Sequence, residues 1–237
     1  MRLPLSNPNF PYAFTQTDSY VHDPETSVTS VSKSSLSIGT ASSTRLVVAV
    51  VAAVDTASTG NSISGAADGV TIAGINANCQ RVNTSTASES LICGIAYANV
   101  TSGTTCTVAI NFTNTFSGEW LVSVYTIDTG YSFSGGNIGQ DTTPGSDGYL
   151  YGSTLGNGQP VAIGAAMWEV TNLDPASWGG DWTTAGEYSR NLSSIATVCI
   201  APLDRIPGSL GGECAVTPTS FTPGDAACAK WLSFSRT

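Results

Sequence analysis

Apolar and polar positions alternate in short, strand-length runs along most of the chain, and turn-forming residues separate the runs. The most apolar run, Leu46 to Val54, reads LVVAVVAAV and contains no polar position. Such a run is typical of a central strand with both faces covered. Ser27 to Ile38 is polar, which is typical of an edge strand, because polar edges oppose edge-to-edge aggregation. The pattern therefore predicts a sheet with an apolar centre and a polar edge.

The other runs share the strand pattern, with β-branched or aromatic residues bounded by Gly, Pro, Asn or Ser. We expect 69–75 and 78–83 to pair as a short hairpin around Ile75-Asn76-Ala77. Regular short strands joined by turns indicate a sandwich or a barrel. We therefore predict an all-β fold, an antiparallel, jelly-roll-like β-sandwich that forms one domain over residues 26–237. The predicted strands are 27–38, 44–55, 69–75, 78–83, 91–98, 105–113, 120–128, 160–170, 194–201 and 228–235.

The first segment, residues 1–25, lacks helical and strand periodicity and contains the single histidine, His22. We predict an extended arm that lies over its own domain or docks on a neighbouring subunit. Pro and Asn residues interrupt its apolar positions, so we expect no secretion signal. Aromatic residues are frequent anchors in subunit contacts. The candidate docking residues are Phe10, Tyr12, Phe14 and Tyr20.

Charge narrows the choice of partners. Lys and Arg total 8 and Asp and Glu total 17, which gives a net charge of −9. Nucleic acids and anionic lipid surfaces bind through clustered Lys and Arg, and the basic residues here are scattered. No apolar stretch has the length of a membrane helix. We therefore expect neither a nucleic-acid partner nor a membrane partner.

Catalytic and metal motifs are sparse. A single histidine in the arm excludes a two-His zinc site and disfavours a Ser-His-Asp triad. The phosphate-loop and nucleophile-elbow motifs do not occur either. The carboxylates are candidates only by residue type, and nothing in the sequence fixes their separation. We therefore expect no enzyme activity, no cofactor and no metal. The carboxylates considered are Glu119, Asp128, Glu169, Asp181 and Glu187.

Three of the five tryptophans lie between Met167 and Trp182. Flat aromatic rings beside a carboxylate stack on sugars, so Trp178, Asp181 and Trp182 are a candidate glycan-binding set. The alternative, which we favour, is that these rings pack under loops or at an interface, because large aromatics dominate core and interface burial.

The spacing of the cysteines gives candidate disulfides. When two residues pair across an antiparallel hairpin, their residue numbers add up to nearly the same sum for every pair along the hairpin. Cys79 and Cys93 are centred on the polar loop 84–88, and Cys214 and Cys228 are centred on the loop before Pro223. Directly opposed side chains have Cβ atoms about 4.5–5.5 Å apart, and a disulfide requires about 3.5–4.5 Å. We therefore predict the bridges Cys79–Cys93 and Cys214–Cys228.

Other arrangements of the six cysteines remain open. Cys106 is also placed to approach Cys93, and Cys199 to approach Cys214. All six residues are alternatively buried thiols, because free cysteine packs as a small hydrophobe. Zinc is the weakest option, since the sequence has no closely spaced pair of cysteines.

The stretch from Arg45 to Asp128 carries a family likeness. An apolar strand precedes Val70-Thr71-Ile72-Ala73-Gly74, and Ala96-Tyr97-Ala98-Asn99-Val100 follows before an alternating strand. This order resembles a β-sandwich module that recurs in structural proteins of phages and prophages. Thr101 stands where the pattern usually has proline.

The resemblance implies a phage virion structural protein, most readily a capsid decoration, cement or spike protein or a tail appendage, attached through the arm. Its implied partners are shell or tail subunits and further copies of itself. It would be made in the host cytoplasm without a signal peptide and would then reside in the virion. The alternative is a carbohydrate-binding module of a tail fibre or secreted protein, which would use the Trp-rich loop 167–182.

Overall fold

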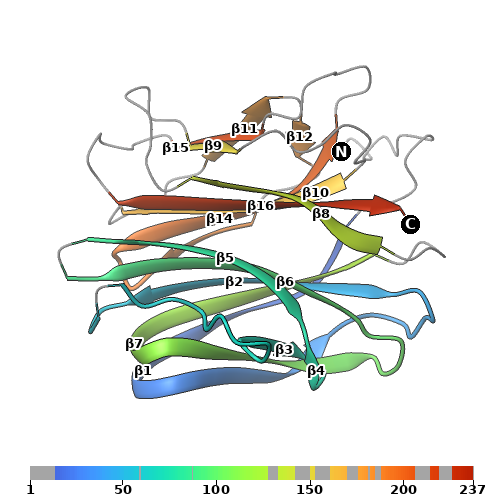
Figure 1. Cartoon of the computed structure of the whole chain (residues 1–237), viewed down its shortest axis with the longest axis horizontal. Helices are drawn as coiled ribbons and strands as arrows, with labels where there is room; N and C mark the ends of the chain where they lie inside the picture. The colour runs from blue at the N-terminus through green and yellow to red at the C-terminus, as the bar shows by residue number, and fades with distance from the viewer. Residues whose placement is uncertain are drawn as a thin grey trace.

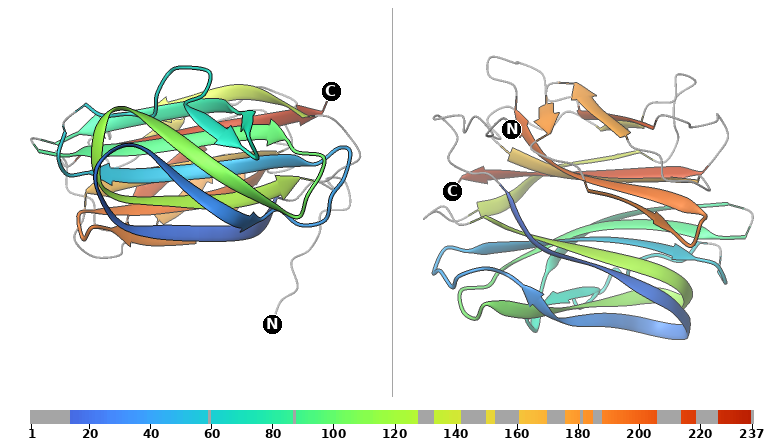
Figure 2. Two further views of the ribbon diagram at one scale, coloured as in Figure 1. Left: turned by 90° about the horizontal axis from the view of Figure 1, so that it is seen from below. Right: turned by 180° about the vertical axis from the view of Figure 1, so that it is seen from behind.

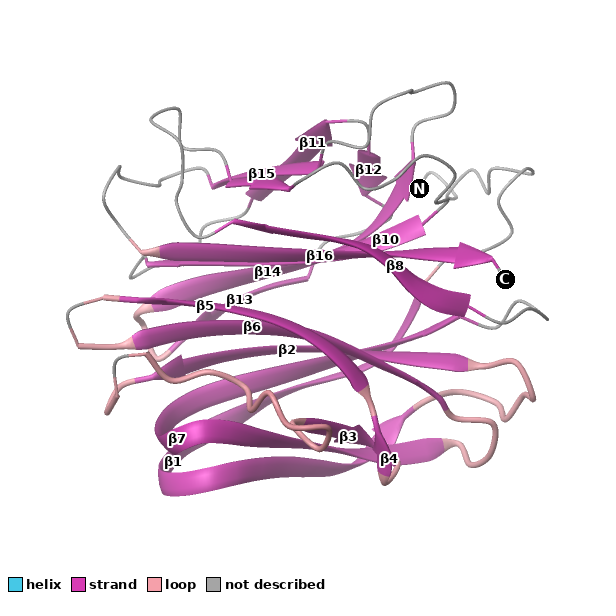
Figure 3. Ribbon diagram, in the orientation of Figure 1, coloured by secondary structure: helices cyan, strands magenta, loops and turns pink. Residues whose placement is uncertain are grey.

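The computed structural model is built from antiparallel β-sheets (Figure 1, Figure 3). Its described part contains no helix, which confirms the predicted all-β antiparallel sandwich. No described segment is therefore a helix that could span a membrane. The structure describes residues 14–58, 60–86, 88–127, 133–141, 150–152, 161–169, 176–180, 182–184, 188–205, 214–218 and 226–236.

The first sheet contains the strands of the N-terminal half. Its order is β4-β3-β7-β2-β6-β5, and β1 pairs with the other edge of β7. The strands are β1 Thr15–Ser37, β2 Leu46–Asp55, β3 Val70–Ile72, β4 Ile75–Asn76, β5 Asn78–Ser85, β6 Ser90–Asn99 and β7 Thr105–Ile127.

The C-terminal half forms two further sheets. The second sheet has the order β12-β14-β10-β16-β8, with β13 also paired to β14, and the third sheet has the order β11-β15-β9. The strands of the second sheet are β8 Phe133–Asp141, β10 Val161–Glu169, β12 Trp182–Thr184, β13 Tyr188–Leu192, β14 Ala196–Arg205 and β16 Ala227–Arg236. Those of the third are β9 Leu150–Gly152, β11 Ala176–Gly180 and β15 Cys214–Pro218.

The sheets are stacked, and the first one also curls upon itself (Figure 1, Figure 2). Three apolar layers result: an inner layer inside the curled first sheet, a middle layer between the first and second sheets, and an outer layer between the second and third. The inner layer includes Val47, Ile72, Ile110 and Trp120. The middle layer includes Val48, Cys93, Tyr125, Ile163 and Leu232. The outer layer includes Trp168, Val216 and Trp231.

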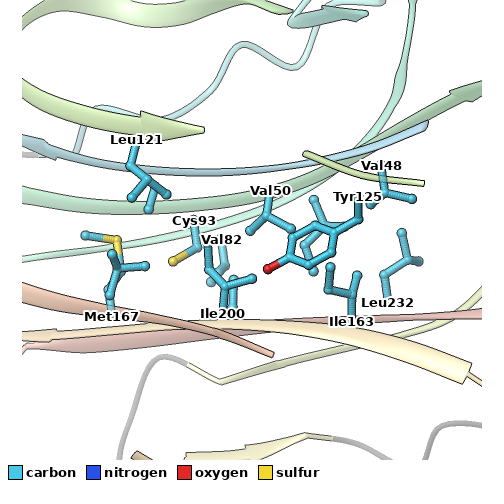
Figure 4. Close-up of a cluster of buried hydrophobic side chains, with 14 of the residues drawn as sticks. Val48, Val50, Val82, Cys93, Leu121, Tyr125, Ile163, Met167, Ile200 and Leu232 are labelled. Carbon is cyan, nitrogen blue, oxygen red and sulfur yellow. The ribbon is translucent and has the colours of Figure 1, made fainter. Parts of the chain in front are cut away.

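Strand β2 shows why the first and second sheets stack. It lies between β6 and β7, and all of its residues are buried. Because side chains alternate across a strand, Val47 and Ala49 enter the inner layer, whereas Val48 and Val50 enter the middle layer. Figure 4 shows the second set facing Ile163 of the second sheet. The prediction of a central strand with both faces covered is confirmed.

Strand β7 is one continuous, bent strand where the sequence predicts two. Its first part pairs with β3 and its second part with β2, and β1 follows it throughout. At the start of the second part, Gly118 has a φ of 153°, and a Cβ there would lie 2.0 Å from the Val54 carbonyl oxygen. Glycine therefore allows β7 to approach β2 at the bend.

The predicted hairpin between 69–75 and 78–83 is wrong. β3 pairs with β4 around Ala73 and Gly74, whose φ values are 54° and 76°, and β5 pairs with β6. Two successive positive φ values are the signature of a type I′ turn, which joins strands two residues apart. The chain therefore reverses earlier than the hydrophobic pattern indicates.

The part of the predicted arm from Thr15 to Glu25 lies in β1, where for example His22 is opposite Trp120. Register shifts on both sides of Glu25 and the residue Pro24 interrupt the alternation, so the sequence does not reveal this strand. Residues 15–25 therefore do not form an extended arm, as the sequence predicts, but belong to the first sheet. Residues 1–13 lie outside the described residues.

Candidate functional site

A groove of about 460 Å³ opens at one end of the middle layer, where the first sheet meets the turn between β13 and β14. A volume of this size is within the range of small-molecule sites. Its walls come from four segments that are far apart in the sequence. The lining residues are Pro24, Glu25, Thr26, Thr56, Ser117, Gly118, Glu119, Ser193, Ser194 and Ile195.

The wall formed by the first sheet depends on the bend in β7. The Ser117 carbonyl accepts hydrogen bonds from the Thr56 amide at 2.7 Å and the Thr56 hydroxyl at 3.0 Å. The Ser117 hydroxyl accepts a hydrogen bond from the Ser27 amide at 2.9 Å. One residue of β7 therefore holds β1 and the end of β2 in place beside the groove.

The opposite wall is the β13–β14 turn. Ser193 and Ser194 both have a φ of 54°, and the Ile195 amide donates to the Leu192 carbonyl at 3.0 Å, as in a type I′ turn. The Ser193 amide donates to Glu119 Oε2 at 2.6 Å. A carboxylate of the first sheet therefore fixes a turn of the second sheet across the groove.

Behind the groove lies a fully buried carboxylate, Asp55. Its Oδ1 accepts hydrogen bonds from the amides of Ala57 at 3.0 Å and Ser117 at 3.1 Å, and its Oδ2 accepts one from Asn61 Nδ2 at 2.6 Å. Asn61 Oδ1 in turn accepts hydrogen bonds from the Ser62 amide, the Thr113 hydroxyl and the Asn114 amide. Asp55 is thus a structural acceptor that closes this end of the curled sheet.

The other end of the curled sheet is closed by a buried guanidinium. Arg45 is 1% exposed, and its hydrogen bonds go to main-chain carbonyls of two loops. The acceptors in the β1–β2 loop are Ile38, Gly39 and Thr40, and those in the β6–β7 loop are Val100, Ser102 and Gly103. One side chain therefore joins both loops.

The polar groups that line the groove are hydroxyls, main-chain groups and the two carboxylates of Glu25 and Glu119. Such a lining can accept hydrogen bonds from hydroxyl or amino groups of a ligand. Within the described part of the chain, no three His, Cys, Asp or Glu side chains lie close enough together to hold a metal ion. The sequence offers Glu119 only by residue type, and the other lining residues carry no recognisable motif, because the fold alone brings them together.

The other predicted carboxylates do not join this groove. Glu169 Oε2 accepts a hydrogen bond from the Ala226 amide at 3.5 Å, next to the start of β16. Asp128, Asp181 and Glu187 lie outside the described residues.

The predicted docking aromatics that the structure describes contribute to the protein's own core. Phe14 is 8% exposed and makes edge-to-face contacts with Tyr125 and Phe234, at centroid distances of 6.3 and 5.6 Å. Tyr20 packs against Trp120 at 6.0 Å, and Lys33 Nζ lies 3.8 Å from the centroid of its ring. These contacts favour the alternative in which this segment lies over its own domain. Phe10 and Tyr12 lie outside the described residues.

Of the predicted glycan-binding set, only Trp178 has a described side chain. This residue is half-buried on β11 and packs against the outer layer. Its Cζ3 atom lies 2.4 Å from the position that a Cβ on Gly164 would take, so the ring fills the space above this glycine. This placement favours the packing alternative. Trp182 lies on β12, and Asp181 lies outside the described residues.

The predicted Cys79–Cys93 disulfide is wrong. Cys79 is opposite Ala96, and Cys93 is opposite Val82, so the two cysteines are three register positions apart. The turn is closed by the Thr86 amide, which donates to the Glu89 carbonyl at 3.0 Å, later than the sequence predicts. An odd register shift reverses the face of every side chain. Cys79 consequently packs toward the inner layer and Cys93 toward the middle layer.

The predicted Cys214–Cys228 disulfide is also wrong, because the two cysteines lie on strands of different sheets and Cys228 packs into the middle layer, on the face of the second sheet turned away from the third. β15, which begins at Cys214, pairs with β9 and β11 in the third sheet, whereas β16 belongs to the second. The two strands therefore do not form the expected hairpin. The described thiols are buried or half-buried, as the alternative of unbridged thiols requires. The free cysteines are Cys79, Cys93, Cys106, Cys199 and Cys228.

Burial governs the chemistry of these thiols. It raises the pKa of Cys79 to about 11, and the nearby positive charge of Arg81 opposes this shift. Burial likewise raises the pKa of Cys106 to about 11. On the second sheet, Cys199 Sγ lies 3.1 Å from the Ser189 hydroxyl. Because the thiolate is the nucleophile, we expect these thiols to react slowly with alkylating reagents in the folded protein.

Comparison of the chain with protein-family models, with curated proteins and with solved structures found no match. The described residues define an all-β protein of three stacked antiparallel sheets, of which the first is curled and nearly closed.

Proposed function

We propose that this protein is a structural component of a phage virion, of the capsid-decorating, cement, spike or tail-appendage type. The observation that carries the proposal is the extent of the resembling segment. Residues 45–128 contain strands β2 to β7, which form the first sheet together with β1. The segment that resembles the phage module therefore supplies six of the seven strands of one sheet.

Buried polar side chains close both ends of this sheet, which is consistent with a structural role. Arg45 joins two loops at one end, and Asp55 and Asn61 join the loops at the other end. Networks of buried, fully satisfied polar groups make a structure rigid and specify one arrangement. A particle component requires such a fixed shape more than it requires an adaptable cleft.

The proposed attachment to a shell or tail subunit now depends on Phe10 and Tyr12, because Phe14 and Tyr20 pack within the protein's own sheets. A deletion that tests attachment should therefore remove residues 1–13 and retain β1, which begins at Thr15. Removal of residues 1–25 would also remove core contacts, so loss of binding would then be ambiguous.

The proposal is tested on phage particles induced from the source culture and purified by density. Mass spectrometry and immunogold labelling should find the protein on the particles at a fixed ratio to the major shell or tail subunit. In a binding assay, particles stripped of the protein should take up the full chain and reject the chain that lacks residues 1–13. Absence of the protein from intact particles would overturn the proposal.

A glycan array provides the counter-test. The half-buried position of Trp178 against Gly164 gives the carbohydrate-binding alternative no structural support. Sugar binding that Trp178→Ala and Trp182→Ala both abolish, in variants that remain folded, would nevertheless replace the structural proposal.

A further inference from the structure

Two cysteine thiols meet in the middle layer, one from each half of the protein. Cys93 lies on β6 of the first sheet and Cys228 on β16 of the second, and both are 0% exposed. Both belong to the middle layer, across which β6 and β16 pack. Figure 4 shows Cys93 in this layer, with Met167 and Ile200 on the facing sheet.

A contact across the middle layer places the two thiols near each other. Cys228 Sγ lies 3.7 Å from the Leu91 carbonyl oxygen, its acceptor, on the strand that also carries Cys93. Cys228 also contributes to the raised pKa of Cys93, as a neighbouring thiol does. The neighbour of Cys93 on β2 is the small residue Ala52, which leaves room for the second sheet to approach.

We propose that Cys93 and Cys228 form a disulfide bond that joins the first sheet to the second. In this reaction both S–H bonds break and one S–S bond forms, so the pair loses two protons and two electrons. The oxidant is a small-molecule disulfide such as oxidised glutathione, which exchanges through a mixed disulfide and leaves as two thiols. Antibody domains contain a bond of the same kind between the sheets of a sandwich.

The other described cysteines do not offer this arrangement. Cys79 and Cys106 pack toward the inner layer, and Cys199 faces the outer layer. Burial and the neighbouring thiol of Cys228 raise the pKa of Cys93, so the folded protein contains little of its nucleophilic thiolate. The disulfide should therefore form readily while the chain folds and slowly once the sheets have closed.

The test refolds the full chain from denaturant in a buffer of reduced and oxidised glutathione. The product is weighed, then alkylated in denaturant and digested without reduction. We expect a mass loss of about 2 Da, the difference of two hydrogens. We also expect one linked peptide pair that contains Cys93 and Cys228, and alkylation of the other cysteines. The oxidised protein should melt roughly 10 °C above the reduced one, because the bond closes a long loop.

Matched variants separate this pair from the other thiols. Cys93→Ala and Cys228→Ala should each lose the linked peptide and the rise in melting temperature on oxidation. Cys106→Ala removes a buried thiol from the inner layer and should retain both effects. If a variant fails to fold, the peptide map of the wild-type chain still decides. Alkylation of Cys93 and Cys228 after oxidative refolding, or their linkage to other cysteines, would overturn the proposal.

Discussion

The inner and outer layers of this protein are closed in different ways. The inner layer lies within a curled sheet, and buried charged groups close its two ends: Arg45 before β2 and Asp55 at the end of β2. The outer layer lies between two sheets, and it is filled by the aromatic rings of Trp168, Trp178 and Trp231. A curled sheet brings its loops together over its ends, where their main-chain groups need buried partners. A stacked pair of sheets mainly needs apolar volume.

The two charged groups satisfy opposite sets of main-chain groups. Arg45 donates to carbonyls, whereas Asp55 accepts from amides and from the side chain of Asn61. An isolated buried charge is strongly unfavourable, and hydrogen bonds from oriented main-chain dipoles offset this cost. Each end therefore depends on one side chain, which gives mutations there a large expected effect.

The largest effect is expected for Arg45→Ala. This change leaves the carbonyls of two loops buried without donors, and we expect unfolding free energy to fall by about 4 kcal/mol. Arg45→Lys keeps the charge but has fewer donors and lacks the planar fork, so we expect a loss of about 2 kcal/mol. Urea denaturation followed by circular dichroism measures both values.

Arg190→Ala is the matched control, because Arg190 is exposed on β13 and its guanidinium lies 5.8 Å from the Tyr188 ring centroid. Its effect should remain within about 0.5 kcal/mol. Equal losses for Arg45→Ala and Arg190→Ala would show that the guanidinium does not close the curled sheet.

Asp55→Asn should have the next largest effect. The new amide would place a donor against Asn61 Nδ2, where the carboxylate now accepts at 2.6 Å. We expect a loss of about 3 kcal/mol for this buried mismatch. The double variant Asp55→Asn with Asn61→Asp restores one donor facing one acceptor, so it should recover at least half of the loss. Additive losses in this double-mutant cycle would contradict the proposed pairing.

The outer layer is tested by Gly164→Ala. A Cβ at this position would lie 2.4 Å from Trp178 Cζ3 and 3.1 Å from Trp231 Cδ1. Overpacking of this kind should cost about 2 kcal/mol. In a Trp178→Leu background the same change should cost under about 1 kcal/mol, because the obstructing ring is absent. An unchanged cost in both backgrounds would show that Trp178 does not fill this space.

Much of the fold could be predicted from the sequence, because burial on two faces leaves a direct signal. The apolar runs of β2 and β10 indicate strands covered on both sides, and both are fully buried apart from the last residue of β10. The pairing of the strands was harder to predict from the sequence. A small error in the position of the Thr86–Glu89 turn shifted the register and placed Cys79 and Cys93 on one face instead of two.

The groove and the buried side chains that hold the loops could mostly not be predicted from the sequence. The groove combines four distant segments, and the Cys93–Cys228 contact depends on how two sheets stack, which the spacing of residues across a hairpin does not describe. Arg45 also gives no local signal, since an arginine before a strand is usually exposed. Its role becomes apparent only when the β1–β2 and β6–β7 loops are seen to meet over it.

The smallest expected effect lies at the turn that joins the two halves across the groove. Ser193 and Ser194 adopt left-handed backbone conformations, both with a φ of 54°, that are unfavourable for most residues other than Asn and Gly. The double change Ser193→Asn and Ser194→Gly should therefore stabilise the protein by about 1 kcal/mol. The hydrogen bond to Glu119 should persist, because its donor is the main-chain amide of residue 193. Ser194→Ala is the control and should give no gain. A destabilised Asn-Gly variant in urea denaturation would show that the serine hydroxyls, and not the backbone alone, hold this wall of the groove.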